Sequence, residues 1–515
     1  MTFISVKYGI LLLGILAIYW LKRFTSWRLW VLLIASLIFY ATLQIEYIPL
    51  LFVITLYIPL LLVITLINFN LGQAIALNTS PGSYIKNQNL SNEDWLLAQE
   101  LWNQRRLKLL WLGIGLNVLC LFSFKYIPFV LTNLAGLLNL PAIQQTANGI
   151  GNSLIAPLGL SFFIFECIAY LIDLYRGAPA SNQFLNFAAY KLFFPKLISG
   201  PITRYHPFAG ELKTLQFPTL DRLTEGLWLI ACGAIKKALI ADRIGILVDL
   251  CFGNLERAGS GDLWLAILAY GLQLYLDFSG YVDMARGSAL LLGFNLPENF
   301  NFPYFSTSIA DFWRRWHITL GDWLRNYLYF PLGGSRKGLR RTCFNLFIVM
   351  LIIGIWHGAT WGFVVWGGLH GLALVVHRLT QAASERLNGL KWWWQTGFGV
   401  LVAWLLTQFM VFTSWIFFRL PSIKEASFVI QNLWGKAADI QFAENVYLKP
   451  FGLERFEIAI LLTLIVLLMG FVYSIQRGLK LQLNWPVKLL LVPISLLTVW
   501  LLSPEGGLPY IYFDF

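Results

Sequence analysis

The residue best placed to do chemistry is a histidine inside a long apolar stretch. His357 lies between Gly354 and Gly358 within apolar sequence from 344 to 376. An ionisable group at membrane depth is costly and is a functional candidate by default. A neutral imidazole there can act as a general base, with one nitrogen oriented while the other takes a proton. The two glycines leave room for a substrate or another helix, and Trp356 is expected to contact the substrate. The alternative is a histidine that only hydrogen-bonds across helices.

A second histidine, His317, lies in a segment that we expect to form one continuous helix. Ser308 and Asp311 are spaced like a capping box, which predicts a helix start. The helix would run through His317 to about Tyr329, where the Pro331-Leu-Gly-Gly sequence ends it. His317 is then a second candidate catalytic residue, although an interfacial histidine costs little and can be purely structural.

The same predicted helix is both basic and aromatic, as expected at the cytoplasmic membrane surface. Asp311 and Arg315 can pair at i and i+4, and Trp313 falls on the face of His317. We expect three of its residues to contact the substrate: Arg314, Arg315 and Trp316. The phosphates of a thioester donor would bind the basic surface that contains Arg314, Arg315, Arg325 and Arg336.

A third polar run interrupts a long apolar span. Ser279 and Asp283 share a helix face, Asp283 and Arg286 can pair at i and i+3, and Asp277 has no partner within the helix. One interpretation is a buried structural ion pair with hydrogen bonds between helices. The other is that Asp277 and Ser279 bind substrate in a reaction tunnel or orient the catalytic imidazole.

The remaining histidines and the cysteines indicate structural roles. His370 and His377 share one helical face and are interpreted as packing or interfacial groups, and His206 as a loop residue. A metal site is not expected, because three or four ligands would have to converge without an obvious carboxylate. The cysteines form no CxxC pair and are expected to be free, buried thiols: Cys120, Cys167, Cys232, Cys251 and Cys343.

The elements that must position these side chains are membrane helices. Of the 515 residues 58% are hydrophobic and 12% charged, against about 25% charged in soluble domains. The net charge of +12 comes from short basic clusters between apolar runs, typical of cytoplasmic loops and not of nucleic-acid binding. We predict eleven or twelve crossings in a single membrane-embedded domain, 1–515. The predicted spans are 7–22, 28–44, 47–69, 108–131, 153–174, 222–250, 262–292, 343–356, 360–378, 397–419, 457–475 and 486–503.

Three further predictions concern topology. The segment 186–203 contains Pro195 and Pro201 and is expected to be re-entrant, because interrupted segments survive in lipid only when protein or a water-filled cavity covers them. The Lys and Arg bias of the loops places the N-terminus outside the cytoplasm. The first apolar run has its basic residues behind it and no small-residue cleavage site, so it is expected to be a retained span.

At these residues the sequence resembles the membrane-bound O-acyltransferase family, in particular its bacterial alginate O-acetyltransferase branch. The resemblance covers nearly the whole chain. It rests on the segments Pro157–Phe162, Tyr170–Gly177, Phe194–Tyr205, Leu276–Met284, Asp311–His317, Tyr327–Gly334, Trp356–Trp361 and Ile511–Phe515.

The resemblance implies a fold, a site and a reaction. The fold is a ring of tilted transmembrane helices, with re-entrant and interfacial helices, around a central tunnel. His357 is then the catalytic residue near its middle, and His317 takes the family's other signature position. An acyl group, expected to be acetyl, passes from a cytoplasmic thioester such as acetyl-CoA to a hydroxyl of an extracellular polysaccharide. No permanently bound cofactor is expected. The protein would lie in the cell (inner) membrane among lipids, with an extracytoplasmic acetyltransferase as a partner.

Other activities remain open from the sequence. D-alanyl transfer to a teichoic-acid-like polymer is the nearest within the family and needs a carrier-protein donor. A polysaccharide or lipid transporter without acyl-transfer chemistry would also contain broken helices and buried polar groups. A purely structural subunit of an envelope assembly would tolerate loss of His357 without loss of acyl transfer.

Overall fold

The chain is an all-α protein with helices long enough to cross a membrane. The computed structural model describes residues 2–44, 53–76, 92–153, 156–504 and 507–511, and within these ranges the chain forms helices and no strand. Nine of the described helices have the length and apolar composition of a membrane span, and two shorter helices are also apolar. The predicted fold class, a polytopic helical membrane protein, is confirmed.

Most predicted spans coincide with helices. The span 397–419 matches α20 (Gly397–Arg419), and 262–292 matches α14 (Ser260–Leu291). The span 108–131 is wrong at its end, because α6 (Asn92–Lys125) stops at Lys125 and α7 (Ile127–Leu138) follows, with a proline in its first turn. Residues 47–52 and 154–155 of two predicted spans and 512–515 of the C-terminal motif lie outside the described residues.

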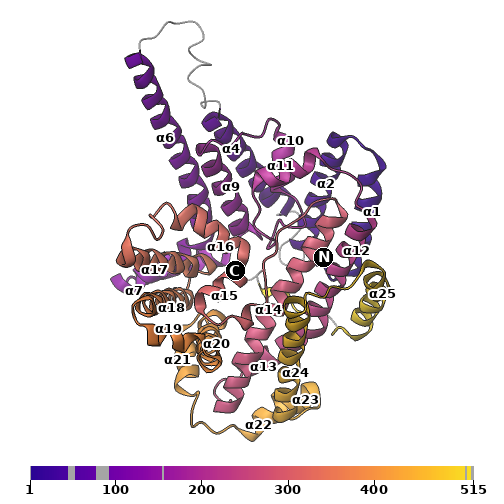
Figure 1. Cartoon of the computed structure of the whole chain (residues 1–515), viewed down its shortest axis with the longest axis vertical. Helices are drawn as coiled ribbons and strands as arrows, with labels where there is room; N and C mark the ends of the chain where they lie inside the picture. The colour runs from indigo at the N-terminus through magenta and orange to yellow at the C-terminus, as the bar shows by residue number, and fades with distance from the viewer. Residues whose placement is uncertain (1, 45–52, 77–91, 154–155, 505–506, 512–515) are drawn as a thin grey trace. The chain divides into compact units, whose positions relative to one another are not determined.

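The described residues form two compact units. Figure 1 labels the helices that belong to them. The first unit comprises Met1–Thr219 and Ser288–Leu296. Its helices are α1 (Val6–Leu21), α2 (Thr25–Gln44), η1 (Val53–Tyr57), α4 (Ile58–Ala76), α6, α7, α8 (Pro141–Ser153), α9 (Leu160–Tyr175), α10 (Phe184–Lys191) and α11 (Tyr205–Lys213).

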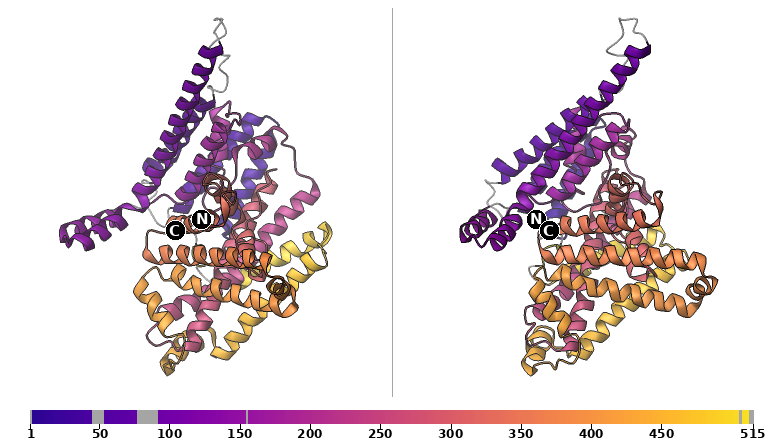
Figure 2. Two further views of the ribbon diagram at one scale, coloured as in Figure 1. Left: turned by 60° about the vertical axis from the view of Figure 1, so that its left-hand side comes forward. Right: turned by 90° about the vertical axis from the view of Figure 1, so that its left-hand side faces the viewer.

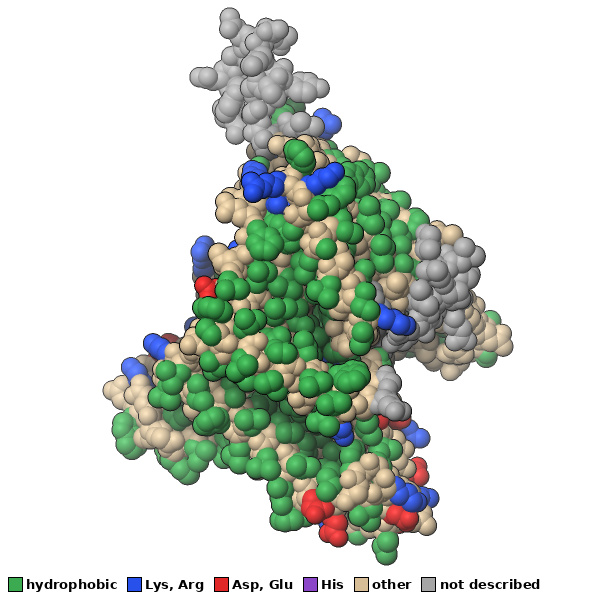
Figure 3. Space-filling view, turned by 90° about the vertical axis from the view of Figure 1, so that its right-hand side faces the viewer, with side chains coloured by type: hydrophobic (Ala, Val, Ile, Leu, Met, Phe, Trp, Pro, Cys, Tyr) green, Lys and Arg blue, Asp and Glu red, His purple; other side chains and the backbone are tan. Residues whose placement is uncertain are grey.

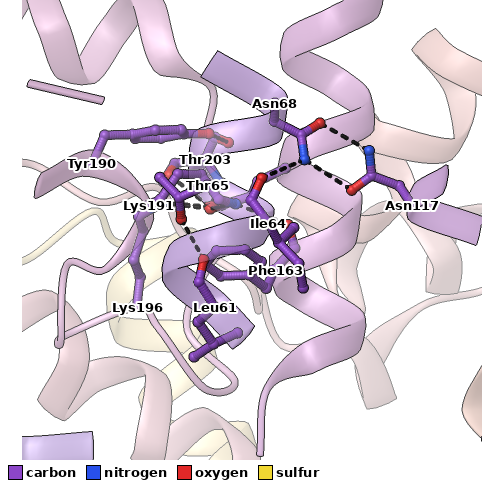
Figure 4. A network of polar contacts seen from close by, with 11 residues as sticks. Leu61, Ile64, Thr65, Asn68, Asn117, Phe163, Tyr190, Lys191, Lys196 and Thr203 are labelled. Carbon is purple, nitrogen blue, oxygen red and sulfur yellow. Dashed lines mark hydrogen bonds and ion pairs between the residues drawn. The ribbon is translucent and has the colours of Figure 1, made fainter. Parts of the chain in front are cut away.

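Within the first unit α4, α6 and α9 pack against one another. Asn68 on α4 and Asn117 on α6 are both buried and exchange two side-chain hydrogen bonds of 3.1 and 2.8 Å, drawn in Figure 4. Gly72 leaves space for the side chains of α9, and a Cβ there would collide with Tyr170. Paired amides and small residues are the usual means of association between membrane helices.

The interrupted segment 186–203 is buried inside the first unit. After α10 the chain runs through turns without a regular helix until α11. Glu166 on α9 holds this stretch: it accepts from Lys191 Nζ at 3.1 Å, from Lys196 Nζ at 2.6 Å and from Thr203 Oγ1 at 3.0 Å. Protein therefore covers the irregular backbone, as lipid requires. That the segment is re-entrant stays a prediction.

The second unit comprises Leu220–Gly287 and Pro297–Phe515. Its helices are α12 (Leu220–Ala234), η2 (Ile235–Ala241), α13 (Asp242–Phe252), α14, η3 (Pro303–Phe305), α15 (Ile309–Arg315), α16 (Ile318–Leu324), η4 (Arg325–Tyr329), α17 (Gly338–His357), α18 (Trp361–Arg386), α19 (Asn388–Gln395), α20, α21 (Ile423–Gln431), α22 (Ile440–Ala443), η5 (Glu444–Leu448), α23 (Lys449–Phe451), α24 (Arg455–Tyr473), η6 (Ser474–Gly478) and α25 (Trp485–Leu502).

Three helices of the second unit, α17, α18 and α20, lie side by side, as the views of Figure 2 show. On the surface drawn in Figure 3, hydrophobic side chains predominate and charged ones are few. Exposed apolar side chains are abundant on α24 and α25, for example Leu467 and Trp500. Such surfaces suit lipid and not water.

Candidate active site

His357 is the last residue of α17 and is buried, with 3% of its surface exposed. Gly358 follows in extended conformation, and α18 begins at Trp361. The connection between the two helices is therefore very short. It holds the imidazole at the end of a helix, where the backbone on both sides is fixed by packing.

Aromatic rings enclose the imidazole of His357. Its ring centroid lies 4.7 Å from Trp356, 5.2 Å from Trp366, 5.0 Å from Phe418 and 6.3 Å from Phe363. These rings come from α17, α18 and α20. Together with its 3% exposure, these contacts leave the imidazole little access to bulk water.

The glycines beside His357 serve helix packing. A Cβ on Gly354 would lie 2.9 Å from the Cα of Gly367 on α18 and closer still to the Phe363 carbonyl oxygen. A Cβ on Gly358 would collide with the Phe363 ring. Of the two occupants that the sequence left open, a neighbouring helix, α18, fills the space. The close approach of α17 and α18 is what brings the α18 rings to His357.

The predicted continuous helix through His317 is wrong. α15 ends at Arg315 and α16 begins at Ile318, with His317 between them in the left-handed conformation, φ 44° and ψ 55°. A non-glycine residue with positive φ is uncommon and costs energy unless its surroundings hold it. Trp313 therefore does not share a helix face with His317. The predicted start is confirmed, because Ser308 Oγ accepts from the Asp311 amide at 3.1 Å.

The proline- and asparagine-rich stretch before α15 holds the break at His317. The Asn299 carbonyl accepts from the Ile318 amide at 3.0 Å, and Asn299 Oδ1 accepts from Thr319 Oγ1 at 2.6 Å. The backbone N–H of Asn301 donates to the Arg315 carbonyl at 3.0 Å. These bonds lie on both sides of His317. They supply the backbone partners that a continuous helix would have supplied.

The imidazole of His317 is buried and uncharged. It is 1% exposed and meets the ring of Phe278 edge-on, with centroids 5.0 Å apart. Burial lowers the pKa of His317 from 6.5 to about 3. The side chain can therefore exchange hydrogen bonds near neutral pH but does not carry a positive charge.

One continuous set of aromatic rings connects the surroundings of the two histidines. Trp316 precedes His317 in the sequence, and its ring centroid lies 5.2 Å from that of Trp415. The Trp415 centroid lies 6.0 Å from that of Trp366, one of the rings around His357. Trp316 is itself 2% exposed. The structure therefore brings His317, Trp316, Trp356 and His357 into one aromatic region of the second unit.

Asp277 takes part in a buried ion network that the sequence did not reveal. Lys237 on η2 pairs with Asp277 and, at 2.8 Å, with Asp242. The Ile511 amide donates to Asp277 Oδ2 at 3.0 Å. A lysine inside apolar sequence was the available signal for this network. The structural interpretation of Asp277 is thus supported by named partners, and its contact with substrate stays a prediction.

The neighbouring groups of α14 behave differently. Asp283 and Arg286 pair at 3.9 Å as predicted, but Asp283 has a closer partner in Lys236 at 2.6 Å. Ser279 is 3% exposed, and its hydroxyl has no hydrogen-bond partner among the described residues. Ser279 follows Phe278, which contacts His317. That Ser279 contacts substrate stays a prediction.

The four arginines of the predicted basic surface lie on α15, on η4 and between η4 and α17, and their role in donor binding stays a prediction. Arg314 and Arg336 are exposed. Arg315 is half-buried and pairs with Asp311 at 2.8 Å, as predicted, and Arg325 pairs with Asp322 at 2.7 Å. Two of these four guanidinium groups are thus already engaged by carboxylates. Arg314 and Arg336 are the more accessible candidates for a phosphate-bearing donor.

His370 has the structural environment expected for it. Its Nδ1 accepts from Trp313 Nε1 at 3.3 Å, and its Nε2 lies 2.9 Å from Ser414 Oγ. These contacts connect α15, which carries Trp313, with α18 and α20. His206 is not in a loop, because it lies in the first turn of α11. The five cysteines are free as predicted, although only Cys167 and Cys251 are fully buried.

Comparison with known proteins agrees with this architecture. The sequence profile of the membrane-bound O-acyltransferase family matches residues 15–418. The chain is 37% identical over 415 residues to a probable alginate O-acetylase of Pseudomonas putida, covering 80% of this chain and 76% of that protein. It is 35% identical to a peptidoglycan O-acetyltransferase of Helicobacter pylori (79% and 74%). A teichoic acid D-alanyltransferase of Streptococcus thermophilus is 27% identical (53% and 72%).

Proposed function

The chain belongs to the membrane-bound O-acyltransferase family, and from this premise we propose that it carries an acetyl group from a cytoplasmic thioester through the membrane to hydroxyls of an extracellular polysaccharide. As a multi-pass O-acyltransferase it is an enzyme, which sets aside a transporter without acyl-transfer chemistry and a purely structural subunit. The acetyl group, the donor, the direction of transfer and the acceptor belong to the proposal.

Sequence similarity favours an acetyl group over a D-alanyl group as the group that is transferred. The relatives with about a third or more identical residues over four-fifths of the chain are named for O-acetyl transfer. The D-alanyltransferase matches only about half of the chain, at lower identity. Alginate and peptidoglycan are both polymers of sugars with free hydroxyls, so the shared chemistry is an ester on a cell-envelope or exported polysaccharide.

One observation carries the proposal: a histidine at the end of an apolar span, buried and ringed by aromatic side chains. His357 would accept the proton of the acceptor hydroxyl as its oxygen attacks the thioester carbonyl carbon. A C–O bond forms, the C–S bond breaks, and the proton passes from the imidazole to the leaving thiolate. The products are an acetyl ester and a free thiol. An acyl-histidine intermediate would be a variant of this reaction.

His317 would orient the acceptor hydroxyl. Because its pKa is lowered to about 3, it stays neutral through the physiological range and acts by hydrogen bonding and not by charge. Its left-handed backbone is fixed by Asn299 and Asn301, which gives the ring a defined position. A preorganised donor or acceptor of this kind costs no rearrangement during the reaction.

Acetyl-CoA is the proposed donor. Its phosphates would bind the exposed guanidinium groups of Arg314 and Arg336, and its acyl end would reach His357. It would act as co-substrate, with no permanently bound cofactor. The N-terminus would be extracytoplasmic in the inner membrane, and the acetyl group would reach the polymer directly or through an extracytoplasmic acetyltransferase.

The experiment replaces His357 by Ala in cells that export the polymer and quantifies released acyl groups by mass spectrometry. His377→Ala, on the adjoining helix α18, is the matched control. At equal membrane abundance, we expect ester-linked acetyl to disappear with His357→Ala and to persist with His377→Ala. Acetylation that survives loss of His357 removes the proposed chemistry. Released D-alanine in place of acetate would replace the acetyl proposal by D-alanyl transfer.

A further inference from the structure

Two buried tryptophans beside the histidines have indole N–H groups without a protein acceptor. Trp366 on α18 and Trp415 on α20 are each 1% exposed, and the Nε1 atom of each lacks a hydrogen-bond partner in the part of the chain that the structure describes. Trp404 and Trp313 of the second unit, in contrast, have acceptors: Trp404 Nε1 donates to the Tyr304 carbonyl at 2.9 Å, and Trp313 Nε1 donates to His370. Trp394 Nε1 on α19 also lacks an acceptor among the described residues, but its side chain is not fully buried and its ring is not one of those around His357.

Burying a donor without an acceptor is unfavourable, so native proteins rarely do it without a reason. An unmatched group usually marks a functional contact or a bound molecule. Here two such groups occur on stacked rings, with centroids 6.0 Å apart and planes inclined by 20°. Two such donors side by side indicate a binding site in which a ligand supplies the acceptor atom.

The position of Trp366 identifies the acceptor. Its ring meets the imidazole of His357 edge-on, with centroids 5.2 Å apart and planes at 88°. The reacting carbonyl must come within reach of the hydroxyl that His357 deprotonates. Because the ring of Trp366 contacts the imidazole, its N–H would lie near the place where negative charge develops on the carbonyl oxygen.

We propose that the indole N–H of Trp366 is a catalytic hydrogen-bond donor to the thioester carbonyl oxygen, with Trp415 as the second donor of the same site. This inference rests on the proposed acyl transfer. When the hydroxyl oxygen bonds to the carbonyl carbon, the C=O electron pair moves to oxygen, and the resulting oxyanion accepts from the indole. Collapse restores the C=O bond, breaks the C–S bond and releases the thiol, with the proton supplied by His357.

An apolar wall around the donor strengthens such a bond. The neighbours of Trp366 are Phe418, with centroids 5.2 Å apart, and Trp415. In this environment of low polarity, a single neutral donor interacts more strongly with an oxyanion than it would in water. Because the indole is rigid and packed, it keeps its direction through the reaction.

The test compares phenylalanine variants of the full-length protein in nanodiscs, supplied with acetyl-CoA and an alginate oligosaccharide. Trp366→Phe keeps an aromatic ring and removes the N–H. Trp404→Phe, in which the N–H that is lost had a protein acceptor, is the matched control. Initial rates of thiol release and acetyl-ester formation give kcat and KM, and thermal unfolding gives stability.

We expect Trp366→Phe to lower kcat on the order of 10²-fold, with KM for acetyl-CoA and the unfolding midpoint little changed. Trp404→Phe should lower the midpoint and leave kcat near the wild-type value. A dithioester donor, whose C=S sulfur accepts hydrogen bonds poorly, should be slower than acetyl-CoA in the wild type. That discrimination should largely vanish in Trp366→Phe, which a purely structural role would not predict.

The failure of this inference can be separated from the failure of the proposed function. If His357→Ala abolishes transfer while Trp366→Phe retains the wild-type kcat, the donor role is wrong and a buried water satisfies the indole. A raised KM with a lowered midpoint would equally overturn it, since that result indicates packing. If His357→Ala also keeps full activity, the proposed function itself fails.

Discussion

A glycine-to-alanine substitution at the contact between α17 and α18 tests whether the close approach of these helices positions His357 for catalysis. Gly354→Ala would place a Cβ 2.9 Å from the Gly367 Cα and nearer still to the Phe363 carbonyl oxygen, whereas real Cβ atoms essentially never come within 3.0 Å. Both neighbours are backbone atoms of α18 and cannot rotate away. The helices must separate by roughly 1 Å to restore ordinary van der Waals contact with the carbonyl oxygen.

That separation would act on catalysis more than on folding. His357 lies three residues beyond Gly354, so its ring moves relative to the α18 rings. A displacement of this size can cost about 10²-fold in rate. Overpacking would cost about 1–3 kcal/mol of stability, offset in part by the better helix propensity of alanine, about 1 kcal/mol.

Gly368→Ala is the matched control on α18. A Cβ at Gly368 meets no atom within 4 Å, so this variant should be as active as wild type and slightly more stable. The assay measures acetyl-ester formation per correctly inserted molecule at saturating acetyl-CoA. Equal activity of Gly354→Ala and Gly368→Ala would refute the argument that the close approach of α17 and α18 sets the site.

Three further predictions concern stability, each measured by unfolding in detergent. Because burial lowers the pKa of His317 to about 3, the unfolded chain binds a proton below pH 6.5 that the folded protein does not. Acidification from pH 7 to 5 should therefore destabilise wild type by about 2 kcal/mol more than His317→Asn; identical pH dependence would contradict this. Ile511→Pro removes the N–H that donates to Asp277 and should cost about 1–3 kcal/mol, whereas Ile511→Val should be neutral; equal stability of the two variants would argue against this anchor. Asn117→Ala should cost about 1 kcal/mol through its bonds to Asn68, and a double-mutant cycle that shows no coupling would argue against the pair.

The membrane helices could be predicted because apolar length alone determines them. The span 397–419 coincides with α20 for this reason. The break between α6 and α7 was missed because apolar sequence resumes at Ile127, directly after Lys125 and Tyr126. Hydropathy does not distinguish one long span from a span followed by a second, shorter helix.

The two histidines show where prediction from sequence stops. His357 could be identified because an imidazole in apolar sequence is costly. The break at His317 could not, because it depends on hydrogen bonds that Asn299 accepts and that the Asn301 backbone N–H donates, and both residues lie in a preceding loop. Local capping signals favoured a continuous helix, and tertiary contacts decided otherwise.

The same limit applies to Asp277 and Trp366. The partners of Asp277, Lys237 and the Ile511 amide, are far away in the sequence, and no local spacing connects them. Trp366 is one of 22 tryptophans. Only its burial, its missing acceptor and its contact with His357 single it out.

The central claim is that His357 transfers acetyl from a thioester on one side of the membrane to an alcohol on the other. Proteoliposomes with one protein orientation, given labelled acetyl-CoA outside and alginate oligosaccharide inside, test this most directly. Wild type should build up labelled acetyl ester on the enclosed oligosaccharide, and His357→Ala should form none while inserting normally. Equal labelling of the enclosed sugar by both proteins would contradict the account.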